Sequence, residues 1–340
     1  MKKFLHITLL FLLIVSCRKN NEENIEGPSL NDLYGPFDIL SNLELNDSIN
    51  FSTGENVAFK MEISKKTDWE IEVTGSSTGA KKKFTGKSRI LSLENASWKG
   101  GADAFPSFAL EKSYITIRFP NEENAPIIND TITITGLKKE KGTLITSFED
   151  DFKYHWDSFN QETVNGAIIC SDGNAAKGDC YYKWNGLVNW TKTDGSYEWI
   201  IGKININAPD SGFSLPTNAK TLFFNMGNRM VSNTGKNNCL IRFSFDEDDN
   251  GDGIFDPGKE DRFTYEYWYE NDQWNLISFK YGDLKYDSDG NLANLKGNGL
   301  PEPSKLISIE VLFLANSATG KVSEADADHI IFTENEPYKP

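Results

Sequence analysis

The sequence predicts an all-β protein: an N-terminal immunoglobulin-like sandwich followed by a larger jelly-roll β-sandwich. Hydrophobic and polar residues alternate with period two over many short runs, which is the pattern of half-buried strands. No stretch between these runs has the periodicity of an amphipathic helix, and Gly, Asn and Asp mark turns between them. The 340 residues allow two domains of ordinary size after a short leader.

The leader has the pattern of a secretory signal peptide. Two lysines precede the apolar run 4–15, which is shorter than the roughly 20 residues that a membrane-spanning helix needs. The segment Ile-Val-Ser-Cys that ends at Cys17 resembles a bacterial lipobox, which implies removal of residues 1–16 and acylation of Cys17. Residues 17–36 are polar, and we expect them to form a lipidated tether. An ordinary signal peptide with a chance cysteine is the alternative.

The rest of the chain divides into two regions of strands. Residues 37–140 hold short alternating runs, and about a hundred residues of this pattern suit an immunoglobulin-like spacer. A lysine-rich stretch then marks a junction, and residues 143–335 hold longer, aromatic runs that suit a jelly roll. Strands are expected at 56–63, 69–73, 114–119, 131–135, 222–226, 240–245, 263–269, 274–279, 307–313 and 329–332.

Charge and cysteine content limit the possible partners. A formal net charge of -15 argues against nucleic acid and anionic membrane surfaces, because a polyanion would be repelled. Cys170 and Cys180 could form a disulfide outside the cytoplasm. Cys239 stands in an apolar run and is expected to be a buried strand residue.

An acidic loop carries the sharpest local motif. Oxygen ligands at alternate positions can wrap a hard cation, and a glycine allows the sharp turn between them. Lysine stands at the twelfth position, where such loops have a bidentate glutamate, so that ligand must come from Glu260 or Asp261. The alternative is a solvated acidic hairpin tip. The other expected ligands of a structural Ca²⁺ are Asp248, Asn250, Asp252, the carbonyl of Ile254, and Asp256.

The two ends of the second region resemble those of carbohydrate-binding, galactose-binding-like jelly rolls. The region opens with Ser-Phe-Glu-Asp at 147–150 and closes with Asp-Ala-Asp-His-Ile-Ile-Phe-Thr at 326–333. In that family the two ends pair and often hold a structural calcium. The resemblance therefore implies Glu149 and Asp328 as Ca²⁺ ligands, with plain hydrogen bonding between the first and last strands as the alternative.

The whole layout is similar to that of surface glycan-binding lipoproteins in starch-utilisation-type outer-membrane glycan uptake systems. This resemblance implies non-catalytic binding of a polysaccharide or oligosaccharide for delivery to an outer-membrane importer. It also implies a lipid-anchored protein on the extracellular side of the outer membrane. The alternatives are an adhesin or assembly protein that binds a protein partner and, less favoured, a carbohydrate-active enzyme.

A glycan site needs exposed rings beside hydrogen-bonding side chains, because sugars offer both apolar faces and hydroxyl groups. Strand parity places Arg242, Glu266, Trp268 and Trp274 on outward faces, where they could line one surface. Trp184 and Trp190 flank a turn-like segment and form a second expected platform. No metal-binding histidine pair, nucleophile elbow or phosphate loop is present in the sequence, so an enzyme is not expected.

Overall fold

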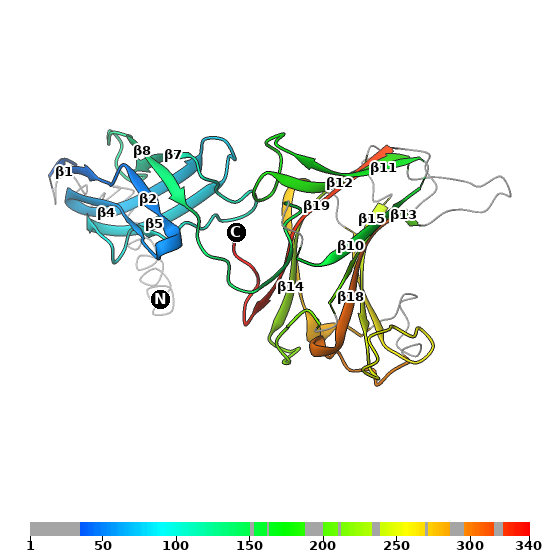
Figure 1. Cartoon of the computed structure of the whole chain (residues 1–340). Coiled ribbons are helices and arrows are strands. Elements are labelled where there is room, and N and C mark those ends of the chain that lie inside the picture. The colour runs from blue at the N-terminus through cyan, green and yellow to red at the C-terminus, as the bar shows by residue number, and fades with distance from the viewer. Residues whose placement is uncertain are drawn as a thin grey trace, which may run out of the picture.

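The protein is all-β and consists of two β-sandwiches in succession along the chain, as the computed structural model shows (Figure 1). This confirms the predicted fold class. No helix in the described part is both long enough and apolar enough to cross a bilayer. Cys17, the expected leader 1–16 and nearly all of the expected tether lie outside the described residues. The structure describes residues 35–149, 153–161, 163–187, 200–209, 212–232, 239–268, 271–285, 296–315 and 322–340.

The first sandwich has the immunoglobulin-like arrangement of two facing sheets. Its larger sheet has the order β1-β4-β7-β8-β2, with β5 also paired to β4, and β3 pairs with β6 in the smaller sheet. β2 runs parallel to β8, whereas the other pairs are antiparallel. The strands are β1 (Ile39–Glu44), β2 (Ser48–Asn50), β3 (Val57–Ala58), β4 (Lys60–Gly75), β5 (Lys81–Leu91), β6 (Ser97–Trp98), β7 (Lys112–Arg118) and β8 (Ile128–Gly136).

β4 illustrates how the alternating pattern builds the first core. Trp69, Ile71 and Val73 are buried, while the glutamates between them, Glu70 and Glu72, remain partly exposed. Because successive side chains of a strand point to opposite faces, this alternation fixes which face of the sheet packs inward.

The second sandwich has two sheets between which the chain passes repeatedly, with only β11–β12 and β15–β16 as consecutive strands of one sheet, and this is the jelly-roll arrangement. The near sheet (β11-β12-β19-β14-β17, with β9 beside β19) faces the first sandwich, and the far sheet (β10-β13-β18-β15-β16) lies on the opposite side (Figure 1). The strands are β9 (Thr143–Thr146), β10 (His155–Asn160), β11 (Val164–Cys170), β12 (Cys180–Leu187), β13 (Ile200–Asn207), β14 (Leu222–Ser232), β15 (Cys239–Glu247), β16 (Arg262–Tyr267), β17 (Asn271–Lys280), β18 (Leu306–Ala315) and β19 (Val322–Glu334).

An aromatic core fills the space between these two sheets. The ring of Phe224 in the near sheet lies 4.9 Å from that of Phe243 in the far sheet and 5.1 Å from that of Phe279. Cys239 is fully buried at the start of β15, as predicted. The predicted bridge between Cys170 and Cys180 is present and joins β11 to β12.

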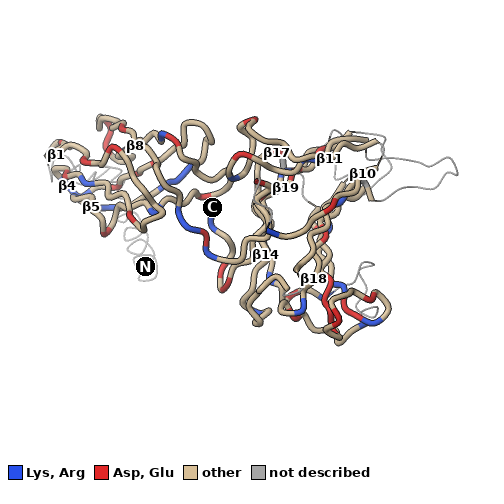
Figure 2. The backbone as a smooth tube through the Cα atoms, in the orientation of Figure 1, with Lys and Arg blue, Asp and Glu red and all other residues tan. Residues whose placement is uncertain are grey.

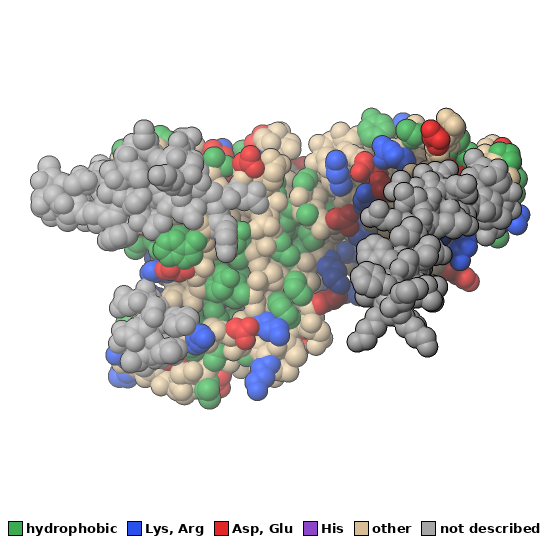
Figure 3. Space-filling model, turned by 180° about the vertical axis from the view of Figure 1, so that it is seen from behind, with side chains coloured by type: hydrophobic (Ala, Val, Ile, Leu, Met, Phe, Trp, Pro, Cys, Tyr) green, Lys and Arg blue, Asp and Glu red, His purple; other side chains and the backbone are tan. Residues whose placement is uncertain are grey.

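The two sandwiches contact each other through both apolar and polar groups. Phe105 of the first sandwich stacks on Tyr338 near the C-terminus, with 5.9 Å between ring centroids. The Ser107 amide donates to the Ala176 carbonyl at 2.8 Å. A linker rich in lysine follows β8 and leads into the second sandwich (Figure 2). Charged side chains gather where the sandwiches meet (Figure 3), and the ion pair between Lys177 and Glu140 lies there.

Candidate functional site

The outward face of the far sheet is lined by polar side chains from all of its strands. Ile204, Phe243 and Val311 point into the core, so their neighbours in sequence point outward. Strand register aligns these outward side chains in rows across the sheet. We call this surface the far-sheet polar face. Its rows are Phe159, Lys203, Leu312, Arg242 and Glu266; then Asp157, Asn205, Glu310, Ser244 and Thr264; then His155, Asn207, Ser308, Asp246 and Arg262.

Hydrogen bonds hold the middle of this face in a fixed arrangement. The Lys203 ammonium donates to Glu310 at 2.8 Å, and the Ser308 hydroxyl donates to the Asn205 side-chain oxygen at 2.8 Å. The Asn205 amide group in turn lies 3.5 Å from a carboxylate oxygen of Asp157. These bonds link β10, β13 and β18, so the polar groups are positioned before any ligand arrives.

An arginine and an aspartate face each other on the neighbouring strands. Arg262 on β16 donates from two nitrogens to the carboxylate of Asp246 on β15, with Nη2 at 2.7 Å from Oδ2. Burial raises the pKa of Asp246 above its ordinary value, and the hydrogen bond from Arg262 opposes that rise. Such a bidentate pair fixes the planes of both groups, which favours recognition of a ligand with defined geometry.

Exposed aromatic rings lie at the margins of the face. Trp268 follows β16 two residues after Glu266, and 39% of its surface is exposed. Phe159 on β10, at the opposite edge of the sheet, is 45% exposed. Arg242 on β15 and Glu266 on β16 form an ion pair, with Nε 2.8 Å from Oε1, and β16 leads on to Trp268. The face therefore combines apolar ring surface with donors and acceptors.

The structure brings three of the predicted glycan-contact residues together and separates the others. Arg242 and Glu266 pair across β15 and β16 of the far sheet, and Trp268 follows directly after the last residue of β16. Trp274 belongs to β17 of the near sheet, so its expected grouping with them is wrong. Trp184 is fully buried inside β12, because this segment is a strand and not a loop, and a buried indole cannot stack on a sugar. Trp190 lies outside the described residues.

The strands β10, β13 and β18 supply side chains to the face that sequence reasoning did not select. Lys203 and Glu310 are separated by 107 positions in the chain, and only the pairing of β13 with β18 joins them. Alternation in each strand marks these residues as outward-facing. That signal alone does not distinguish them from any other solvated strand residue.

The loop predicted to bind calcium is folded around two of its expected ligands. The Asp248 carboxylate accepts backbone N–H groups from residues 251, 252 and 253 at 2.6 to 3.2 Å. Glu260 turns into the loop and accepts the amides of Asn250 and Asp256. Asp261 turns away and accepts the amides of residues 297 and 299. The sequence leaves Glu260 and Asp261 as candidates for the bidentate ligand. Of these two, only Glu260 points into the loop, where it could reach a bound cation.

The other expected loop ligands lie in tight turns of the same segment. The side chains of Asn250 and Asp252 each accept a backbone amide two residues further on. Asp256 accepts the Gly258 amide and forms an ion pair with Lys259 at 2.7 Å. Ile254 is exposed, at 71%. Calcium binding by this loop remains a prediction.

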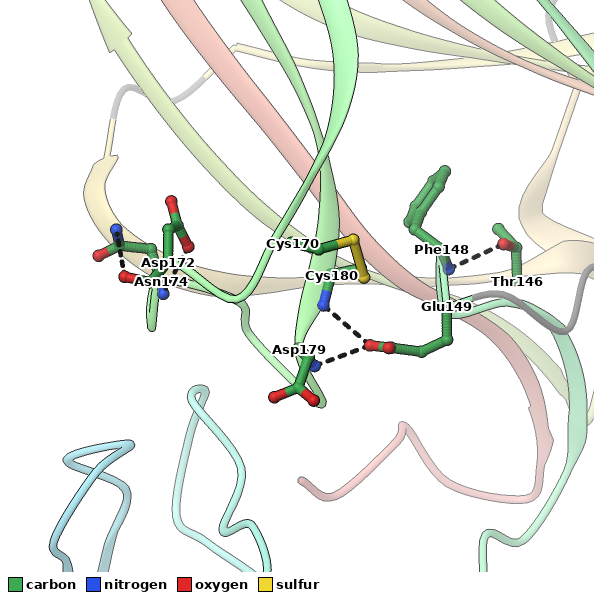
Figure 4. The surroundings of a disulfide bond; sticks show 8 residues. All are labelled: Thr146, Phe148, Glu149, Cys170, Asp172, Asn174, Asp179 and Cys180. Carbon is green, nitrogen blue, oxygen red and sulfur yellow. Dashed lines mark hydrogen bonds between the residues drawn. A yellow bond between two sulfur atoms is a disulfide. The ribbon is translucent and has the colours of Figure 1, made fainter.

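Glu149 and Asp328, the second expected calcium pair, both contact the segment before β12. Glu149 Oε1 accepts the amides of Asp179 and Cys180 at 2.8 and 2.9 Å, beside the disulfide (Figure 4). Asp328 Oδ2 accepts the Lys177 amide at 2.9 Å. Its Oδ1 is buried and has no hydrogen-bond partner among the described residues.

The surroundings of Asp328 disfavour the negative charge of its carboxylate, and a bound cation would offset this effect. Burial raises the pKa of Asp328 well above its ordinary value, and the negative charge of Glu149 adds to the rise, whereas backbone donors oppose it. A cation near both carboxylates would offset the desolvation. The residues present therefore fit a structural Ca²⁺, although its presence remains a prediction.

Comparison with known proteins gave structural similarities only. No protein-family model matches the chain, and no curated protein matches it. The family 11 carbohydrate-binding module of the cellulase Lic26A-Cel5E of Clostridium thermocellum has 16% sequence identity and a TM-score of 0.36, and the match covers 58% of this chain and 96% of that one. SGBP-B from a complex xyloglucan utilization locus in Bacteroides uniformis has 10% identity and a TM-score of 0.36, over 88% of this chain and 73% of that one.

A third similar structure is the CBM22-1 xylan-binding domain of Paenibacillus barcinonensis Xyn10C. It has 11% identity and a TM-score of 0.32, and the match covers 59% of this chain and 99% of that one. These similarities are remote in both sequence and geometry. The assignment of a function to this chain therefore depends on its own side chains.

Proposed function

We propose that this protein binds a polysaccharide or oligosaccharide at the cell surface, without catalysis, for delivery to an outer-membrane importer. The observation that carries the proposal is the far-sheet polar face, where fixed polar groups lie on one sheet and the exposed Trp268 follows the end of β16 at its edge. Sugar hydroxyls are both donors and acceptors, and the exposed part of the face offers carboxylate, guanidinium and amide groups to match them, whereas the hydroxyls of Ser244, Thr264 and Ser308 are buried. The indole offers flat apolar surface for the C–H face of a sugar ring.

The placement of this face supports capture from solution. The far sheet lies on the side of the second sandwich that is turned away from the first (Figure 1). In our proposal an acylated Cys17 anchors the chain in the outer membrane, and the first sandwich acts as a spacer. Several acyl chains would hold the protein on the membrane without a spanning helix, because each buried methylene contributes roughly 0.8 kcal/mol. The proposed face then points toward the cell exterior.

Affinity electrophoresis against a panel of polysaccharides tests the binding proposal. We expect at least one polysaccharide to retard the protein without release of sugar products. Trp268→Ala should abolish most of the retardation. Trp274→Ala is the matched control, since it removes an indole from the other sheet of the same sandwich and should leave retardation unchanged.

Two results would contradict the binding proposal. One is the absence of retardation by every polysaccharide in a broad panel, and the other is equal loss in the two tryptophan variants. The anchor is tested separately by mass spectrometry of the mature protein and by protease treatment of intact cells. An unmodified N-terminus, or full protection from protease, would count against a lipid-anchored surface protein.

A further inference from the structure

Three carboxylates converge where β15 ends. Glu247 is the last residue of β15, Asp249 follows in the loop, and Glu302 comes from the turn before β18. One oxygen of each lies within 4.8 Å of the others. Acidic residues concentrate in this loop region, at the end of the second sandwich (Figure 2). We call these carboxylates the acidic trio, and none of them is among the predicted loop ligands, although Glu247 and Asp249 stand on either side of Asp248 in the chain.

Glu247 has a buried oxygen that its surroundings leave without a donor. The side chain is fully buried. Its Oε1 accepts the Tyr281 hydroxyl at 2.7 Å and the Glu302 amide at 2.8 Å. Its Oε2 is also buried but contacts no hydrogen-bond donor in the part of the chain that the structure describes. A buried carboxylate oxygen without a partner is costly, and a bound cation is one means of satisfying it.

The spacing of the trio fits calcium. Oxygen ligands lie about 2.4 Å from Ca²⁺, so two oxygens on opposite sides of the ion are about 4.8 Å apart. One oxygen of each member of the trio lies within that distance of the others, so their spacing is compatible with ligands of one ion. Mg²⁺ demands near-ideal octahedral geometry at about 2.0–2.1 Å, keeps several of its waters and is usually held by only one or two carboxylates, so a set of three protein carboxylates suits it less well than Ca²⁺.

The charges near the trio leave it short of positive partners. Lys305 is the neighbouring cation, with Nζ at 2.6 Å from Glu302 Oε2 and 3.2 Å from Asp249 Oδ1. One ammonium group does not balance three carboxylates.

We propose that Glu247, Asp249 and Glu302 bind a divalent cation, Ca²⁺ by preference, at a site separate from the predicted calcium loop. The ion joins the end of β15 to the turn that precedes β18. These strands carry Asp246 and Ser308 of the far-sheet polar face, so the site stabilises one end of that face. The proposal does not depend on what the face binds.

Isothermal titration of CaCl₂ into the chelator-treated full chain tests this site. We expect the wild-type protein to bind one more Ca²⁺ than Glu302→Gln, whatever the loop itself binds. Glu302 is a suitable position because its side chain is 35% exposed, so the variant should fold, and an unchanged melting temperature in chelator verifies this. Glu247→Gln should lose the same ion, while the retained amide oxygen can still accept from Tyr281.

Two further variants separate this site from its neighbours. Asp252→Asn alters the predicted loop and should leave the trio's ion in place. Lys305→Met removes the competing ammonium and should tighten Ca²⁺ binding several-fold. The proposal is overturned if Glu302→Gln and Glu247→Gln bind as many ions as the wild type with unchanged affinity, because Lys305 would then be the cation that the trio uses. Titration with MgCl₂ should show weaker binding, and equal affinity would overturn the preference for calcium.

Discussion

Arg242 and Glu266 face each other across the β15–β16 pair, with Nε donating to Oε1 at 2.8 Å. Their side chains are 26% and 28% exposed, so the pair is fixed in position but still reachable from solvent. Exposed ion pairs contribute little to folding. The same groups, held rigidly beside an exposed indole, can contribute much more to ligand binding.

Glu266→Gln is therefore expected to lower glycan affinity by more than it lowers stability. We expect the free energy of unfolding to change by less than about 1 kcal/mol, as for other exposed pairs. Affinity should fall about tenfold, which corresponds to about 1.4 kcal/mol. Titration with the polysaccharide that retards the wild-type protein measures the affinity, and urea unfolding measures the stability.

Glu62→Gln provides a matched control for that variant. It breaks the ion pair between Glu62 and Arg89, 3.0 Å apart on the surface of the first sandwich. Its effect on stability should resemble that of Glu266→Gln, whereas glycan affinity should be unchanged. If both variants retain full affinity, the ion pair on the far sheet is not part of the binding surface.

Local alternation was enough to predict part of this surface. In the run that forms β16, Phe263 is buried while Glu266 and Trp268 retain exposure, as period-two parity required. Trp274 follows the same rule within β17, where Ile277 and Phe279 point inward. Parity gives the direction of a side chain within its strand but does not say which of two sheets the strand joins, so Trp274 was grouped with the wrong neighbours.

Trp184 shows a different limit of sequence reasoning. The Asn-Gly pair that follows it is a strong turn signal, and the sequence therefore predicts a loop for this segment. In the structure Asn185 and Gly186 continue β12 and pair with β11 and β19, and Trp184 packs 4.8 Å from Tyr182 in the core. Pairing on both sides of the strand overrides the local propensity, and that pairing is a tertiary property.

The disulfide should stabilise the hairpin of β11 and β12. Cys170 and Cys180 are 10 positions apart, and closing a loop of this size in the unfolded chain is worth about 2–3 kcal/mol. A Cys170→Ser and Cys180→Ser double variant should lose this amount in urea unfolding and become insensitive to reductant. Cys239→Ala, outside the bridge, should keep the response to reductant. Equal stability of the wild type with and without reductant would contradict the expectation.

Phe105 is expected to couple the unfolding of the two sandwiches. It is 6% exposed and stacks on Tyr338, with His329 on its edge at 6.5 Å. Phe105→Ala should weaken the contact by about 3–5 kcal/mol. Calorimetry should then resolve two transitions where the wild type has one. Phe159→Ala is the control: it removes an exposed ring and should keep the single unfolding transition of the wild type. Two transitions in both variants, or one transition in both, would argue against coupling through Phe105.

Glu111 should make the stability of the first sandwich depend on pH. Burial alone would raise its pKa, but hydrogen bonds from Thr78, Ser77 and the Ala109 amide outweigh burial and hold the pKa below the ordinary value of 4.5. Because the folded state favours the charged form, the stabilisation is complete above pH 4.5 and is lost as pH falls through the lowered pKa.

The variant Glu111→Gln isolates this contribution. Near pH 7 its free energy of unfolding should be about 1–3 kcal/mol lower than that of the wild type, since the substitution removes a charged acceptor from a buried cluster of donors. The difference should shrink as the pH is lowered below 4.5, because the wild-type carboxyl group then becomes protonated and loses the same interactions. Glu94→Gln, at an exposed position, should match the wild type at every pH. A difference for Glu111→Gln that stays constant from pH 7 to pH 3 would mean that the charge of Glu111 is not what the donors stabilise.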